Sequence, residues 1–183
     1  MDRRVAIKNL ALVLGGSIVL PSCLHETAKT IHLKHFNISQ DQIDLVSLVA
    51  ETIIPKTDTP GATDLGLQHF VLKMVDDCTP KDTQQSFLKG ADQLESRSKK
   101  LFGKSFAQCG KQQRESMLNN IEQHPDAASK EESDFFKTVK GFTVFGYTYS
   151  KFFMTKELVY ELVPGRYNGY FPVNKAKGGP KFG

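Results

Sequence analysis

The chain has three cysteines, and the residues around the first one predict a chemical modification of its thiol. Cys23 follows Leu20, Pro21 and Ser22, so a leucine stands three residues before the cysteine and a small residue just before it. This spacing matches a lipobox, the pattern in which a precursor is cut before the cysteine and the cysteine is acylated. The sequence therefore predicts that Cys23 is lipidated and becomes the first residue of the mature chain.

The residues before Cys23 have the three parts of a secretory signal: a charged start, a short apolar core and small residues at a cut site. The apolar run from Leu10 to Leu20 is about half the length that spans a bilayer. Arg3 and Arg4 resemble the paired arginines of the twin-arginine export signal, although an alanine and an isoleucine replace its usual aromatic residue and leucine. We expect a signal peptide over residues 1–22.

A buried N-terminal helix is the alternative for this region. It is the weaker interpretation because the run has no polar face, which a buried helix of a small domain normally shows. Pro21 would also stop such a helix just before Cys23. Residues 23–37 are polar and lack a long hydrophobic period, so we expect them to form a tether between the lipid and a folded domain.

Cys78 and Cys109 are the other two cysteines, and an exported protein can oxidise such a pair. A disulfide between them would close a loop of about 30 residues and stabilise the fold by roughly 3 kcal/mol. Two separate thiols are the alternative. The sequence gives no distance between the cysteines, so both possibilities stay open.

No other group of residues predicts catalysis or cofactor binding. His25, His32 and His35 have no carboxylate or cysteine held with them on a rigid element, so we expect them to be solvated and not to bind a metal. A self-contained metal enzyme that uses His69 or His124 is a further, weaker alternative. The sequence has no glycine-rich dinucleotide fingerprint, no haem attachment motif and no evident Ser, His and Asp grouping. We expect no catalytic, cofactor-binding or metal-ligating residue in this chain.

The charge of the chain also argues against a nucleic-acid partner. Its net charge is +4, and the predicted signal peptide carries two of these positive charges in excess. Lysines elsewhere are mixed with acidic residues, as in the stretch "KEESDFFKTVK", so no basic face is evident.

The hydrophobic pattern predicts helices throughout the mature chain. Ser39 and Gln42 form a capping-box sequence, and the apolar stripe that follows stops at Pro55, which predicts a helix over residues 40–54. A loop follows, in which Pro60 and Gly61 suit a type II turn.

Four further helices are expected. The second carries an apolar stripe from Leu67 to Val75. The third begins with Thr79 as N-cap and Pro80 as its first residue, ends at Gly103, and has a stripe of Phe87, Ala91, Leu94 and Leu101. The last two cover residues 110–123 and 131–154, the latter with one face formed by Phe135, Val139, Phe142, Gly146, Tyr149 and Phe153.

The predicted fold is therefore all-α: a single domain of about five helices over residues 38–172, with an irregular C-terminal segment and a flexible tail at 173–183. The irregular segment contains the stretch "PGRYNGYFP", which is rich in turn residues and aromatics. Its aromatics either cover the helices of their own domain or dock on a partner protein, and docking suits an irregular segment with little core nearby. We expect the second and assign the contact to Pro164, Gly165, Arg166, Tyr167, Gly169, Tyr170 and Phe171.

Three stretches carry a resemblance to a known family. These are "AETIIPKTDTPGATDLG" at 50–66, "GYTYS" at 146–150 and "LVYELVPGRYNGYFP" at 158–172. Together they resemble the small third subunit of membrane-bound gluconate 2-dehydrogenase, over about Ile43 to Pro172. The chain departs from this pattern at Lys151 to Met154, where family members tend to have an acidic residue and small residues.

The resemblance implies an accessory, non-catalytic subunit. In that enzyme a large flavoprotein with FAD oxidises the sugar acid, a cytochrome c subunit accepts the electrons, and the small subunit accompanies the flavoprotein and supplies its export signal. Together with the lipobox at Cys23, this predicts a chain that is anchored to a membrane by lipid and faces the periplasm. The alternative is a free-standing envelope lipoprotein whose helical domain binds another partner.

Overall fold

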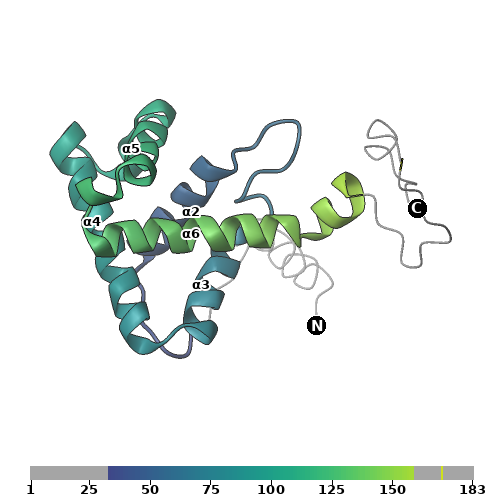
Figure 1. Ribbon diagram of the computed structural model, residues 1–183, viewed down its shortest axis with the longest axis horizontal. Coiled ribbons are helices and arrows are strands. Elements are labelled where there is room, and N and C mark those ends of the chain that lie inside the picture. Colours follow the sequence, from purple (N-terminus) through teal and green to yellow (C-terminus); the bar gives the residue numbers. More distant parts are fainter. Residues whose placement is uncertain (1–32, 159–169, 171–183) are drawn as a thin grey trace, which may run out of the picture. The chain divides into compact units, whose positions relative to one another are not determined.

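The computed structural model describes residues 33–158 and residue 170, and Figure 1 shows how their helices are arranged. Within these residues the α-helices are α2 (Gln40–Ile53), α3 (Leu67–Cys78), α4 (Lys81–Phe102), α5 (Lys111–Gln123) and α6 (Lys130–Thr148). Short helical turns lie at Phe106–Gln108, Pro125–Ala127 and Phe153–Glu157. No strand occurs in the described part, so the all-α prediction is confirmed.

Helix α6 is the centre of the domain, because it contacts α2, α3, α4 and α5 (Figure 1). Its most extensive contact is with α4, where the rings of Phe87 and Phe135 lie 4.8 Å apart. Gly90 lets the two helices approach closely: a Cβ atom there would lie 2.5 Å from Cβ of Phe135 and would also meet the carbonyl oxygen of Glu131. The largest buried side chains of the core include Val46, Val49, Leu72, Leu94, Phe106, Ile121, Phe135 and Val139.

Several of the predicted helix boundaries are confirmed. Ser39 caps α2 and forms the expected capping box with Gln42. Gly103 ends α4 in the left-handed conformation, with φ of 69°, which glycine adopts without a Cβ penalty. Helix α5 begins and ends within one residue of its prediction.

Two predictions for α4 are wrong. Thr79 does not cap α4, because its hydroxyl instead donates a 2.6 Å hydrogen bond to the carbonyl oxygen of Val75 and so closes the end of α3. Pro80 is the N-cap of α4. Leu101, which the sequence predicts in the buried stripe, is 57% exposed; the buried face of α4 continues from Leu94 to Ser98 instead.

The last predicted helix is interrupted. Helix α6 ends at Thr148. The Thr148 hydroxyl donates to the carbonyl oxygens of Val144 and Phe145, and such a side-chain hydrogen bond competes with the backbone hydrogen bonds of the helix. Ser150 then starts a new turn: its hydroxyl accepts from the N–H of Phe153 at 3.1 Å, as an N-cap does. The segment Phe153–Glu157 continues as a π-helical turn.

Candidate functional site

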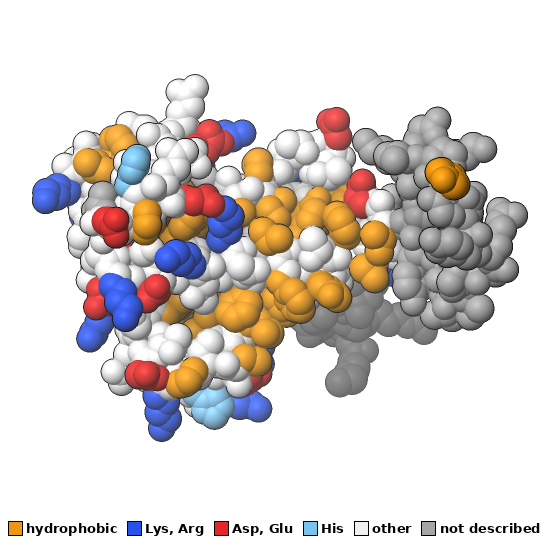
Figure 2. All heavy atoms as spheres, viewed as in Figure 1, with side chains coloured by type: hydrophobic (Ala, Val, Ile, Leu, Met, Phe, Trp, Pro, Cys, Tyr) orange, Lys and Arg blue, Asp and Glu red, His pale blue; other side chains and the backbone are white. Residues whose placement is uncertain are grey.

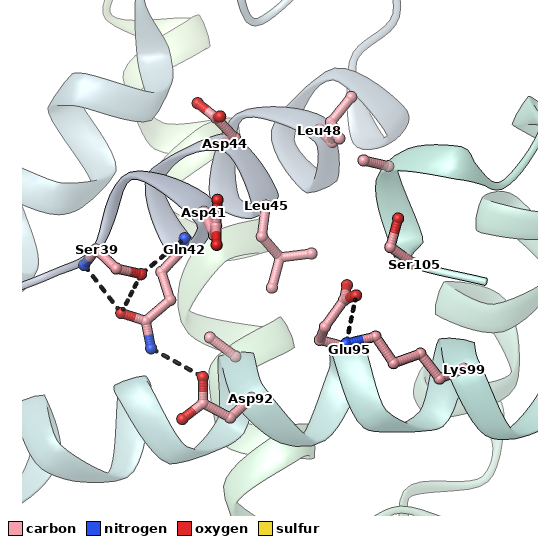
Figure 3. Close-up of a pocket in the computed structure, with 12 residues that line it drawn as sticks. Ser39, Asp41, Gln42, Asp44, Leu45, Leu48, Asp92, Glu95, Lys99 and Ser105 are labelled. Carbon is pink, nitrogen blue, oxygen red and sulfur yellow. Dashed lines mark hydrogen bonds and ion pairs between the residues drawn. The ribbon is translucent and has the colours of Figure 1, made fainter.

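A surface groove of about 490 Å³ lies between α2, α4 and the turn that contains Ser105 (Figure 3). Its acidic side chains are largely bonded to neighbouring groups. Gln42 donates to Asp92 at 2.9 Å, and Glu95 accepts from the backbone N–H of Phe106 at 3.0 Å and pairs with Lys99 at 3.5 Å. These interactions fasten the two helices and the turn together, so the groove is a structural seam.

The histidines of the described part do not assemble into a metal site. Within residues 33–158 no group of three or more His, Cys, Asp or Glu side chains is placed to hold a metal ion. His69 lies on α3 and His124 follows α5, while His25 and His32 fall outside the described residues. A self-contained metal enzyme based on His69 or His124 therefore has no support in this part of the chain.

The loop after α2 is organised by one carboxylate. Glu51 accepts hydrogen bonds from the backbone N–H groups of Lys56 and Thr63, each at 3.0 Å, and from the Thr63 hydroxyl at 2.5 Å. Burial alone would raise the pKa of Glu51, but these three donors together lower it below its usual value. Lys56 and Asp64 add an ion pair of 3.1 Å across the loop.

Gly61 is needed in this loop for space. The type II turn expected at Pro60 and Gly61 requires a positive φ at the glycine, and among the described residues only Gly66 and Gly103 have one, so that prediction is wrong. A Cβ atom at Gly61 would lie 2.6 Å from the Glu51 carboxylate and 2.7 Å from the backbone nitrogen of Lys56. The glycine allows the chain to pass close to Glu51.

Tyr147 joins this loop to the end of α6. Its hydroxyl donates to the Thr59 hydroxyl at 3.4 Å, and its ring packs against the buried Ala50, Ala62 and Leu67. Phe153 meets the edge of the same ring, with centroids 5.9 Å apart. The stretches 50–66 and 146–150, which are far apart in the sequence, thus form one surface region.

An exposed apolar surface lies beside this region on α6. Val144, Phe145 and Tyr149 are 42%, 46% and 68% exposed. The ring of Phe145 stacks on Phe70 of α3 at 6.0 Å and lies 4.6 Å from the ring of Tyr149. We call Phe70, Val144, Phe145 and Tyr149 the α6 patch.

The α6 side of the patch lies in an uncharged stretch of the chain. No charged residue occurs between Lys140 and Lys151, and Figure 2 shows hydrophobic side chains gathered over α6 on the face in view. Contiguous exposed aromatic surface of this kind is typical of a protein interface. The sequence predicts Tyr149 along one face of a continuous helix, whereas in the structure α6 ends at Thr148 and Tyr149 is its exposed C-cap residue.

The residues predicted to dock on a partner lie mostly outside the described part. Tyr170 is described and is 96% exposed, whereas Pro164, Gly165, Arg166, Tyr167, Gly169 and Phe171 are not. Arg3, Arg4 and Cys23, which are predicted to direct export and lipidation, also lie outside it. None of the helices described is both long and apolar enough to cross a lipid bilayer.

The two remaining cysteines are separate thiols in the structure. Cys78 is exposed at the end of α3, whereas Cys109 is buried, with its Sγ atom 3.2 Å from the Ser98 hydroxyl. Of the two alternatives that the sequence left open, the structure has the second.

Comparison with known proteins gives one result. The family model described as gluconate 2-dehydrogenase subunit 3 matches residues 40–165. No curated protein and no solved structure matches the chain. The matched range contains α2 to α6, the loop organised by Glu51 and the α6 patch.

Proposed function

The chain belongs to the gluconate 2-dehydrogenase subunit 3 family, and from this we propose that it is the lipid-anchored, non-catalytic subunit of a membrane-associated, flavin-dependent sugar or sugar-acid dehydrogenase. In this proposal a large flavoprotein subunit holds FAD and oxidises the substrate. A cytochrome c subunit receives the electrons. The present chain assists export of the flavoprotein and holds it at the membrane, facing the periplasm.

The family match is the observation that carries this proposal, since a family of subunits implies a partner chain. The α6 patch supports it by offering a surface suited to that partner. Aromatic rings bury a large area at small cost in side-chain entropy and are enriched among the residues that dominate binding. The patch is also held in place, because Tyr147 ties the end of α6 to the loop organised by Glu51.

We expect the α6 patch to contact the flavoprotein. The double variant Phe145→Ser, Tyr149→Ser removes two exposed rings and should weaken binding at least about tenfold, since a residue that dominates an interface contributes about 2 kcal/mol. Both side chains are partly exposed, so the melting temperature of the isolated subunit should fall less than it would on truncation of a buried aromatic residue. The measurement is the affinity of the full chain for the co-expressed, FAD-loaded flavoprotein.

Leu101→Ser is the matched control, because Leu101 is an exposed apolar residue at the far end of α4 and lies outside the α6 patch. It should leave the affinity unchanged. Equal affinities of the wild type and the double variant would contradict docking through the patch. If no flavoprotein co-purifies with the wild-type chain, the accessory role itself is wrong.

The segment Pro164–Phe171 remains a second proposed contact with the flavoprotein. Tyr167→Ala and Tyr170→Ala belong in the same assay. They should lower the affinity without lowering the melting temperature of the isolated subunit, because the aromatics serve the partner in this proposal.

A further inference from the structure

We propose that the carboxylate of Asp76 is a binding site for the chain's own N-terminal segment, so that the membrane tether ends at Leu33, four residues earlier than the sequence indicates. The proposal rests on the lipid anchor of the proposed function. Asp76 lies in the last turn of α3 and is only 1% exposed. Its Oδ2 accepts a hydrogen bond from the backbone N–H of Lys34, and its Oδ1 accepts one from the N–H of His35, both at 2.7 Å.

The position of Asp76 is unfavourable for a charged group in two respects. Burial removes the carboxylate from water, which is costly unless the charge is paired and hydrogen-bonded. The last turn of a helix also carries the negative end of the helix dipole, which repels a carboxylate. A carboxylate at this position therefore requires strong partners, and the two N–H groups occupy both of its oxygens.

The balance of these effects favours the ionised form. Burial raises the pKa of Asp76, but the N–H groups of Lys34 and His35, followed by the charges of His35 and Lys73, together hold it below its usual value. Lys73 is the nearest cation on α3, with its Nζ atom 3.7 Å from Oδ2. Without residues 34 and 35, most of the stabilisation of this buried charge would be absent.

The Asp76 site binds backbone and not side chains. The side chains of Lys34 and His35 are exposed, while their N–H groups point to the carboxylate. Backbone N–H groups are the same in nearly every residue type, so the sequence of 23–37 does not show that residues 34 and 35 are bound to the domain. Their attachment is visible only through the partner on α3, more than 40 positions along the chain.

This attachment shortens the distance that the anchor can span. A free tether of residues 24–33 reaches at most about 35 Å when fully extended, whereas residues 24–37 would reach about 50 Å. Lys34 and His35, the first residues bound to the domain, lie beside the C-terminal end of α3. The Asp76 site therefore limits how far this end of the domain can lie from the lipid surface.

Hydrogen exchange on the full, lipidated chain tests the Asp76 site. In the wild type, the amides of Lys34 and His35 should exchange much more slowly than those of an unstructured peptide. In Asp76→Asn, which keeps the shape but loses the charge and one acceptor, they should exchange at least about tenfold faster, the factor that corresponds to one hydrogen bond to a charged group. Trypsin should likewise cleave after Lys34 faster in the variant.

Asp77→Asn is the matched control, since it removes the same charge from the next residue, which is more exposed and pairs with Lys73. It should leave the exchange of residues 34 and 35 unchanged. Core amides of α4 and α6 report whether Asp76→Asn still folds. Wild-type amides at 34 and 35 that exchange like a free peptide would refute the Asp76 site whatever the variant does, and would leave the accessory role untouched.

Discussion

At the scale of single residues, Glu51 has a larger role than its place at the end of α2 suggests. It is the acceptor for three donors from the loop 55–66. Glutamine at this position keeps the shape but replaces one acceptor oxygen with a donor. We expect Glu51→Gln to lower the free energy of unfolding by about 1–3 kcal/mol at neutral pH, because a loop N–H loses its acceptor.

The loss of stability in Glu51→Gln should depend on pH. The direction of this dependence follows from the lowered pKa of Glu51. A carboxyl whose pKa is lower in the folded than in the unfolded state stabilises the fold above the unfolded pKa. This stabilisation disappears as the pH falls from near the ordinary value of 4.5 through the lower folded value. The difference between wild type and Glu51→Gln, measured by urea unfolding, should therefore shrink below about pH 4.5.

Asp58→Asn controls for the change in net charge, because Asp58 is an exposed carboxylate of the same loop. It should alter stability by less than about 0.5 kcal/mol. If Glu51→Gln is as mild as this control, the carboxylate does not hold the loop.

Some residues whose partners are close in sequence could be assigned from the sequence, although Thr79, which bonds to Val75 only four positions earlier, was not among them. Residues with distant partners could not be assigned. The capping box of Ser39 and the helix end at Gly103 depend on neighbours within four positions. The sequence predicts a type II turn at Gly61, which is wrong. The glycine is needed because the Glu51 carboxylate, ten positions earlier in the chain, leaves no room for a Cβ atom. The partners of Asp76 lie further still along the chain.

At the scale of elements, the amphipathic pattern predicted the helices but not the break in α6. A stripe of apolar residues runs from Phe135 to Phe153, so the pattern predicts one continuous helix. It does not show that the Thr148 hydroxyl bonds to the helix backbone or that Ser150 caps a new turn. The α6 patch was missed for a different reason. Exposure depends on which helices cover a face, and hydrophobic spacing does not show this.

The contact between α4 and α6 gives a prediction at this scale. Gly90→Ala should lower the free energy of unfolding by about 1–3 kcal/mol, the usual range for an overpacked core. The added methyl group would meet the backbone carbonyl of Glu131 and Cβ of Phe135, and neither can move without shifting α6. Urea unfolding midpoints at constant slope measure the change.

Gly141→Ala provides the matched control on α6. Nothing lies within 4 Å of a Cβ atom at Gly141, and alanine is favoured over glycine inside a helix by roughly 0.5–1 kcal/mol. This variant should therefore be more stable than the wild type. Opposite signs for the two substitutions would establish the close approach, and a stabilising Gly90→Ala would rule it out.

At the scale of the whole molecule, the proposed function requires the domain to be joined to a membrane at one place and to a partner at another. In the proposals above the first place is the end of α3, through the Asp76 site, and the second is the α6 patch. Phe70 of α3 belongs to this patch and stacks on α6. Helix α3 therefore links the two places, which makes its packing against α6 important for both.

The anchor itself gives the last prediction. The lipobox ending at Cys23 predicts an acylated N-terminus, and the several acyl chains that such a cysteine carries would hold the protein on a membrane, whereas one chain binds only marginally. Cys23→Ala should abolish incorporation of labelled fatty acid and release the chain from the membrane fraction. Cys78→Ala, which removes an exposed thiol from the folded domain, should leave the labelling and the membrane attachment unchanged.

The export route is tested at the paired arginines. Replacing Arg3 and Arg4 with lysine keeps the charge but removes the arginine pair, so the precursor should remain in the cytoplasm together with its flavoprotein. Fatty-acid labelling of Cys23→Ala at the wild-type level would show that the lipid is not on Cys23, and normal export of the paired lysine variant would show that the twin-arginine route is not used.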